Sequence, residues 1–204
     1  MKYSTLALSL GILFVIALGC SRISNMTAPQ AKPYVAENDN FYITFPSGTT
    51  EPSANPDPDA STDNKTQIYS TVNTNVGYRV KAITIGGYSD DYLKENFSVD
   101  DVANTAMEVR FPWRDKGSLT DLEMPPKDAA RNNTNYKTLP AIESSGWTNE
   151  LSSLGNMFKR IRLIWDAPNK KAYSIEVFSK KKEDLNSDET NKFYESFSTG
   201  KPAK

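Results

Sequence analysis

Histidine is absent from the 204 residues and cysteine occurs once, and these two scarcities exclude several kinds of function. Without histidine, the Ser-His-Asp and Cys-His nucleophile systems are excluded, as is every metal site that uses imidazole ligands. The side chain most often used as a general base near neutral pH is missing as well. We therefore predict no catalytic residue, no cofactor and no metal site. An enzyme of this sequence would have to use carboxylates, lysine or tyrosine.

An excess of one charge is also lacking, since 24 lysines and arginines stand against 25 aspartates and glutamates. Nucleic-acid binding is disfavoured, because the phosphate backbone needs a concentrated basic surface. The single cysteine cannot form an internal disulfide, so a hydrophobic core must hold the fold. About 160 residues are enough to build one such domain.

The N-terminus carries an apolar run over residues 6–18. This run is shorter than the ~20 apolar residues of a spanning helix and has the length of a signal-peptide core. It is followed by Gly19 and by Cys20, the only cysteine. This ending resembles the lipobox of bacterial lipoproteins, which places apolar or small residues before an invariant cysteine. Ala17 and Leu18 differ from the residues that are commonest at their two positions.

The resemblance implies cleavage between Gly19 and Cys20 and lipidation of Cys20 in a bacterial cell envelope. Two or three acyl chains would hold the protein on the membrane, because each buried methylene contributes roughly 0.8 kcal/mol. Ser21, which stands where an aspartate would favour the inner membrane, implies the outer membrane, with the protein facing the periplasm. The alternatives are an ordinary cleaved signal with a stray cysteine and an uncleaved N-terminal anchor.

The chain is therefore expected to divide into three parts. Residues 1–19 are the expected signal peptide, residues 20–40 the lipidated cysteine with a flexible tether, and residues 41–200 a single domain. The tether is polar, contains Pro29 and Pro33, and shows no apolar periodicity. A flexible coil of about 20 residues spans roughly 25 Å.

The first half of the domain reads mainly as strands. Phe41 to Phe45 alternates apolar and less apolar residues and stops at Pro46, which predicts a strand followed by a loop over residues 47–66. Residues 67–73 and 76–85 predict a β-hairpin with its turn near Thr74. Ser98–Asp101 resembles a capping box, and apolar residues at helical spacing after it predict a helix that Pro112 ends.

The second half predicts three strands and a terminal helix. A loop over residues 114–132 precedes a strand from Tyr136 to Glu143, with Pro140 at an edge position or bulge. Strands over residues 157–165 and 172–178 are joined by a turn. Ser187 is the expected N-cap of a short C-terminal helix that carries apolar residues on one face. This order predicts an α+β fold with a largely antiparallel sheet flanked by helices.

The same order of elements resembles the PsbP/Mog1-like domains. The resemblance rests on the opening Phe-x-Ile-x-Phe-Pro strand, the strand with Leu139–Glu143, the two long strands after it and the terminal helix with Lys192–Phe197. It implies an α/β/α sandwich used as an accessory or binding module. The metal-linked chemistry of the photosynthetic branch draws partly on histidine, so no site residue is carried over.

Basic residues of the last two strands and of the segment after them form one candidate binding surface. Because these strands are expected to be neighbours, Arg160, Arg162, Lys180 and Lys181 would meet anionic headgroups or an acidic partner. The alternative is a solvated sheet face whose charges discourage edge pairing. The candidate basic surface also includes Lys159, Lys170, Lys171 and Lys182.

Two of the three tryptophans are candidates for a ligand groove. Trp113 and Trp147 lie next to Pro112 and Gly146 in sequence, which favours exposed positions, whereas strand phase places Trp165 in the core.

Two weaker motifs have simpler explanations. Residues 57–63 alternate oxygen-bearing side chains like a calcium loop, but Thr62 stands where glycine is needed and Ile68 where a bidentate glutamate is needed. We interpret this stretch as a solvated acidic loop. Ser179 and Lys182 form a Ser-x-x-Lys pair without the partner motifs of that signature.

The sequence therefore predicts a lipid-anchored, non-enzymatic protein that binds a protein of the envelope or a small ligand. One alternative is a hydrolase that uses Asp90 and Asp91, or Asp100 and Asp101, on envelope glycans. Adjacent helical residues point about 100° apart, so these pairs are poorly placed to flank one bond. A second alternative is a lipid or ligand carrier with a large apolar cavity.

Overall fold

The computed structural model describes residues 33–57, 64–102, 132–148 and 155–200. The fold described here belongs to the unit of residues 31–204. The predictions for Gly19, Cys20 and Trp113 lie outside the described residues. Within the described ranges, no helix has both the length and the apolar character needed to cross a bilayer.

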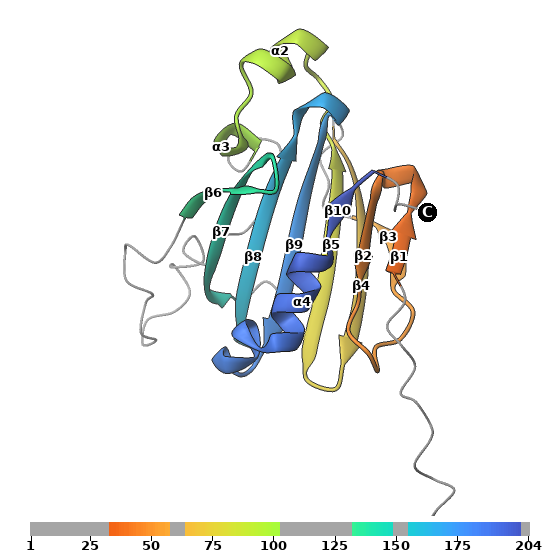
Figure 1. Cartoon of the computed structure of the whole chain (residues 1–204), viewed down its shortest axis with the longest axis vertical. Coiled ribbons are helices and arrows are strands. Elements are labelled where there is room, and N and C mark those ends of the chain that lie inside the picture. Colours follow the sequence, from red (N-terminus) through yellow and green to blue (C-terminus); the bar gives the residue numbers. More distant parts are fainter. Residues whose placement is uncertain (1–32, 58–63, 103–131, 149–154, 201–204) are drawn as a thin grey trace, which may run out of the picture. The chain divides into compact units, whose positions relative to one another are not determined.

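A seven-stranded antiparallel sheet forms the centre of the domain (Figure 1). Its strand order is β3-β4-β5-β9-β8-β7-β6, and every neighbouring pair is antiparallel. This confirms the prediction of an α+β fold with a largely antiparallel sheet. The strands are β3 (Ser53–Pro56), β4 (Lys65–Asn73), β5 (Val76–Thr84), β6 (Asn132–Tyr136), β7 (Leu139–Thr148), β8 (Met157–Asp166) and β9 (Lys171–Ser179).

Tight turns with left-handed residues join the hairpins of this sheet. Thr74 has φ 38° between β4 and β5, where the sequence predicted the turn. Lys170 has φ 53° after the short 3-10 helix η7 (Ala167–Asn169), which joins β8 to β9 at the predicted turn. Strand β9 then pairs with β5 along its whole length, so that Val76 lies opposite Ser179.

A second, three-stranded sheet has the order β1-β2-β10 and consists of β1 (Pro33–Ala36), β2 (Phe41–Thr44) and β10 (Ser198–Thr199). The predicted first strand at Phe41 is confirmed as β2. The prediction that the tether extends to residue 40 is wrong, because β1 pairs with β2 and the 3-10 helix η2 (Glu37–Asp39) joins them. Strand β1 has only 4 residues and begins with proline, so its sequence carries no recognisable period.

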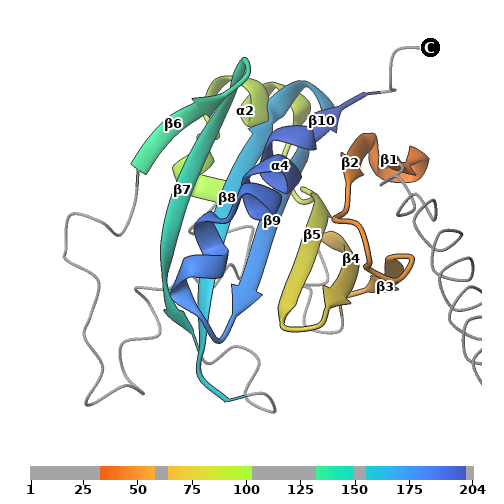
Figure 2. The ribbon, with the colours of Figure 1, turned by 60° about the horizontal axis from the view of Figure 1, so that its bottom comes forward.

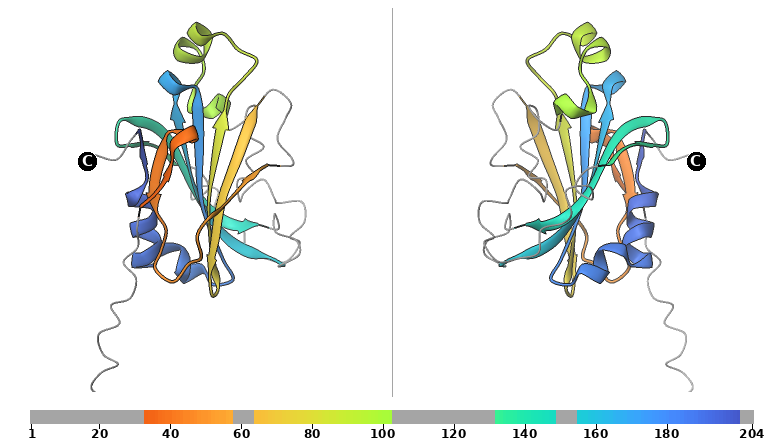
Figure 3. Two further views of the ribbon diagram at one scale, coloured as in Figure 1. Left: turned by 90° about the vertical axis from the view of Figure 1, so that its right-hand side faces the viewer. Right: turned by 90° about the vertical axis from the view of Figure 1, so that its left-hand side faces the viewer.

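One face of the large sheet is covered by helix α4 (Asp188–Ser196) and by β2 of the small sheet (Figures 2 and 3). We call it the α4 face. Ser187 caps the helix as predicted, because its side chain accepts a hydrogen bond from Thr190 N. The ring of Phe193 packs 5.4 Å from that of Phe45 and 5.1 Å from that of Tyr78.

The opposite face, which we call the α2 face, is covered at one end by α2 (Asp90–Glu95) and α3 (Val99–Asp101). The capping box of Ser98 and Asp101 is confirmed. Trp165 is buried there, as predicted, and its indole nitrogen donates to Phe97 O at 3.0 Å. The side chains of this second core include Ile83, Leu93, Phe97, Val102, Ile142, Ile161, Leu163 and Trp165.

Three elements differ from the sequence prediction. The expected strand over residues 136–143 is a hairpin, because Lys137 takes φ 56° and turns the chain between β6 and β7. Pro140 lies opposite Asn135 in that hairpin and outside the pairing of β7 with β8, so its missing N–H breaks no ladder bond there. Strand β3 and helix α2 were not predicted, since both are short.

Replacing Leu93 with alanine tests how α2 is attached. Leu93 is fully buried in the second core, so Leu93→Ala is expected to lower the free energy of unfolding by about 2–5 kcal/mol. Chemical denaturation measures this change. Val72→Ala is the control, because Val72 is 61% exposed and its truncation is expected to change stability by less than about 0.5 kcal/mol. An equal effect of both substitutions would contradict the described packing of α2.

Candidate functional site

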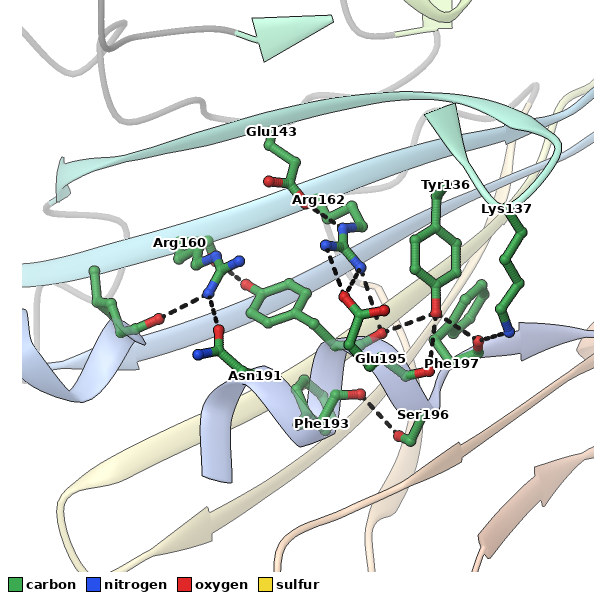
Figure 4. A network of polar contacts seen from close by, with 12 residues as sticks. Tyr136, Lys137, Glu143, Arg160, Arg162, Asn191, Phe193, Glu195, Ser196 and Phe197 are labelled. Carbon is green, nitrogen blue, oxygen red and sulfur yellow. Dashed lines mark hydrogen bonds and ion pairs between the residues drawn. The ribbon is translucent and has the colours of Figure 1, made fainter. Parts of the chain in front are cut away.

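The predicted basic surface is divided between two environments. Arg160 and Arg162 lie on the α4 face, under the C-terminal helix (Figure 4). Lys159 alternates to the other side of β8, where it is buried, so the predicted convergence of these basic residues is wrong. Lys180 and Lys181 follow β9 and are exposed.

Arg160 binds the segment that leads into α4. Its Nη1 donates to Leu185 O at 3.1 Å and to Asn191 Oδ1 at 2.7 Å. The guanidinium lies 4.5 Å from the centre of the Tyr194 ring, and the Tyr194 hydroxyl donates to Arg160 O at 2.6 Å. Arg160 therefore fixes the 3-10 helix η8 (Lys182–Asn186) and α4 against β8.

Arg162 is 7% exposed and bridges β7 to α4. It forms ion pairs with Glu143 and with Glu195, the latter at 3.3 Å. Its guanidinium also lies 4.5 Å from the centre of the Tyr136 ring. These ion pairs neutralise the charge of Arg162 within the domain. Arg162 therefore packs between the sheet and α4 and is not free for a partner.

Tyr136 closes the same network at the end of the chain. Its hydroxyl lies 3.1 Å from Tyr194 O, 3.1 Å from Glu195 O and 2.8 Å from Phe197 O (Figure 4). Burial, reinforced by the charge of Glu195, raises the pKa of Tyr136 to about 12. The hydroxyl therefore stays protonated and donates to the carbonyls that end α4.

A buried ionic cluster lies on the α2 face, beyond the apolar core. Glu176 is 1% exposed and accepts from Arg79 Nε at 2.8 Å, while Lys159 Nζ lies 3.4 Å away. Ser174 donates to its second oxygen at 2.5 Å. Burial alone would raise the pKa of Glu176, but Arg79, Lys159 and Lys81 outweigh it and hold the pKa well below its usual range. Glu176 is thus an ionised structural carboxylate at neutral pH.

Two motif residues from the sequence have structural partners as well. Asp57, the first residue of the calcium-like stretch, pairs with Lys81 at 3.1 Å, whereas residues 58–63 lie outside the described part of the chain. Ser179 Oγ donates to Asp184 at 2.5 Å and accepts from Lys181 N at 3.1 Å, so it caps the end of β9.

The aspartates of the hydrolase alternative lie at helix N-termini. Asp90 pairs with Lys170, whose hydrogen bond lowers the pKa of Asp90, and hydrogen bonds from Ser98 lower the pKa of Asp101. A general acid needs a raised pKa. The two carboxylates are therefore suited to stabilising helix ends, where negative charge is favourable.

Trp147 is half-buried and packs against Phe158, with ring centres 3.7 Å apart and ring planes tilted by 33°. Both strands that carry them belong to the large sheet. Trp147 therefore packs on a neighbouring strand and does not project from a loop.

Among the described residues, the aromatic side chains with the largest exposed fractions are two tyrosines that the sequence did not single out. Tyr88 and Tyr92 are 47% and 44% exposed, and their rings stack with centres 5.4 Å apart and planes 13° apart. Phe97 lies 5.2 Å from Tyr88 and 5.7 Å from Trp165, so a series of rings runs from the core to the surface. We call Tyr88 and Tyr92 the tyrosine surface.

Local structure holds the tyrosine surface in place. Ser89 caps α2 by accepting from Tyr92 N at 3.3 Å, and Leu93 buries the inner side of the helix. Lys170 pairs with Asp90 and ties α2 to the turn between β8 and β9. The sequence signal for this site is the Tyr-Ser-Asp-Asp-Tyr-Leu stretch, in which an N-cap stands between aromatic residues four positions apart. Two stacked rings with polar hydroxyls are suited to contact with a partner.

Comparison with known proteins leaves the chain without an assigned family. No protein-family model and no curated protein matches it. A solved structure of a protein from Bacteroides thetaiotaomicron VPI-5482 is similar at 10% sequence identity, with a TM-score of 0.49. The match covers 84% of this chain and 49% of that protein, so the chain spans about half the length of the structure it matches.

Replacing Glu176 with glutamine tests the ionic cluster. Glu176→Gln removes the negative charge that lies between Arg79 and Lys159, which is expected to lower the free energy of unfolding by about 3–5 kcal/mol at pH 7. Because the folded-state pKa of Glu176 is depressed, its contribution is present above the unfolded pKa of about 4.3 and is lost as pH falls below it. The variant should therefore lose stability less steeply than the native protein below about pH 4.

Denaturant titrations from pH 7 to pH 3 measure both effects. Glu183→Gln is the matched control, because Glu183 is exposed in η8 and its stability profile is expected to follow that of the native protein. Parallel profiles for Glu176→Gln and the native protein would contradict the depressed pKa.

Proposed function

We propose that this protein is a lipid-anchored bacterial envelope protein that acts by binding and not by catalysis, with the tyrosine surface as its contact site. The anchoring half is supported by the apolar run that ends in Gly19 and Cys20 and by the resemblance of this ending to a lipobox. Ser21 supports placement on the outer membrane, with the domain in the periplasm. The partner is a second protein of the envelope.

The domain belongs in this proposal to the PsbP/Mog1-like α/β/α sandwiches. The supporting features are the antiparallel central sheet, α4 on one of its faces, and α2 with α3 on the other. Strand β2 and the terminal helix α4 contain most of the residues of two of the stretches on which the resemblance rests, Phe41–Phe45 and Lys192–Phe197. Accessory and binding roles are what this resemblance implies.

The tyrosine surface is the observation that carries the binding role. Tyrosine is enriched at protein interfaces, since its ring supplies apolar area and its hydroxyl a hydrogen bond. Tyr88 and Tyr92 expose nearly half of their surface while the rings stack on one another. Because the two rings are already held against one another, they lose little side-chain entropy when a partner covers them.

Replacing Cys20 with alanine tests the anchor. Cys20→Ala removes the only thiol that acyl chains could use, so the protein is expected to move from the membrane fraction to the soluble periplasmic fraction. Fractionation of intact cells with immunodetection measures this shift, and mass spectrometry of the native protein should show an acylated Cys20 at the N-terminus. Ser4→Ala inside the signal is the control and should leave the protein on the membrane. A native protein whose Cys20 carries no acyl chain would contradict the anchor.

Site-specific photocrosslinking in intact cells tests the contact site. A benzophenone side chain placed at position 92 is expected to form a discrete adduct with an envelope protein, because this ring is at the centre of the proposed contact. The control is the same side chain at position 72, where Val72 is 61% exposed on the large sheet. Equal adducts at both positions would show that the tyrosine surface is not the contact site.

A further inference from the structure

The outer side of α2 combines the tyrosine surface with two carboxylates. Successive residues of a helix point about 100° apart, so Asp91 and Glu95 lie opposite the buried Leu93, and Tyr92 lies next to them. Both carboxylates are exposed. The helix therefore presents rings, two carboxylates and the exposed Lys94 on the side that the domain core does not use.

Asp91 and Glu95 give this side of α2 a net negative charge, because Lys94 offsets only one of the two carboxylates. The two carboxylates are four positions apart on one helix face, an arrangement in which like charges destabilise a helix. Asp90, by contrast, is paired with Lys170 and helps to attach α2 to the domain. A cation placed between Asp91 and Glu95 would relieve the repulsion, and it would at the same time lie within reach of the Tyr92 ring.

Aromatic rings and carboxylates together select one kind of cation. A guanidinium group is planar, stacks on tyrosine and pairs with carboxylates through a rigid set of donors, whereas an ammonium group attracts as a point charge. Within the domain, Arg160 and Arg162 already bind in this way, each 4.5 Å from a tyrosine ring, and Arg162 pairs with two carboxylates. Among the described residues, the three arginines Arg79, Arg160 and Arg162 contact other parts of the domain, and the same chemistry is available on the outer side of α2.

We infer that the α2 surface of Tyr88, Asp91, Tyr92 and Glu95 binds an arginine-bearing segment of a partner protein. This inference rests on the proposed function and specifies the chemistry of the partner. Anionic headgroups are excluded as occupants, because Asp91 and Glu95 would repel them. A neutral glycan could stack on the rings but would leave the repulsion between the carboxylates in place.

Peptide binding by the purified lipidated protein in non-ionic detergent tests this inference. The probe is a fluorescein-labelled hexapeptide of alternating glycine and arginine, and the comparison peptides carry lysine or glutamate in place of arginine. Fluorescence anisotropy is expected to show binding of the arginine peptide, binding of the lysine peptide that is weaker by about threefold, and no binding of the glutamate peptide. Raising the salt concentration to 0.5 M should weaken the binding further.

Matched variants locate the binding. Tyr92→Ala is expected to weaken the arginine peptide about threefold to fivefold, while Tyr92→Phe retains the ring and should restore most of the affinity. The double variant D91N/E95Q should weaken binding about tenfold, because both charges that pair with the guanidinium are removed. Glu183→Gln and Val72→Ala are the controls and should leave the affinity unchanged. Far-ultraviolet circular dichroism of each variant checks that the fold is retained.

The outcomes separate this inference from the proposed function. Equal affinity of D91N/E95Q and the native protein would overturn the inference even if the crosslink at position 92 is found. Binding of neutral chitotetraose that depends on Tyr92, without binding of the arginine peptide, would also overturn it and leave a contact role for the tyrosine surface. If no probe binds and position 92 yields no more adduct than position 72, both the inference and the proposed contact site fall.

Discussion

Burial of β9 on both of its faces is the constraint on which the described structure depends. Tyr173, Ile175 and Val177 point into the core under α4, while Glu176 points to the α2 face, between Arg79 and Lys159. A charge in such a strand must be paired, since desolvation of a lone carboxylate is far too unfavourable. Arg79 on β5 and Lys159 on β8 therefore face the same side of the sheet as Glu176. Because side chains alternate along a strand, this also fixes which residues of β5 and β8 face the core under α4.

The charged residues of the domain consequently divide into two groups with different roles. Arg160 and Arg162 attach α4 to the sheet, and the ionic cluster around Glu176 holds three central strands together. Helix α2 uses its charges differently, since Asp90 ties it to the domain while Asp91 and Glu95 face outward. Helix α2 thus carries two charges that the described contacts of the fold do not use.

Local patterns were sufficient to predict much of this fold, and tertiary contacts explain where they failed. The hairpin at Thr74, the helix behind Ser187 and the core position of Trp165 follow from alternation, capping and strand phase. Alternation also separates Arg162 from Lys159, but only the packing of α4 shows that the arginine side of β8 is covered. The tyrosine surface could not be predicted, because the exposure of Tyr88 and Tyr92 depends on how α2 lies over the second core.

The hairpin of β1 and β2 is where a load on the proposed anchor would reach the domain. Pro33 lies opposite Thr44 at the open end of this hairpin, and Ala36 lies opposite Phe41 near its closed end. In the proposed anchored state, β1 is therefore the first strand after the tether to bear tension. Phe41 and Ile43 of β2, which lie behind it, are fully buried and would hold the second strand in the core.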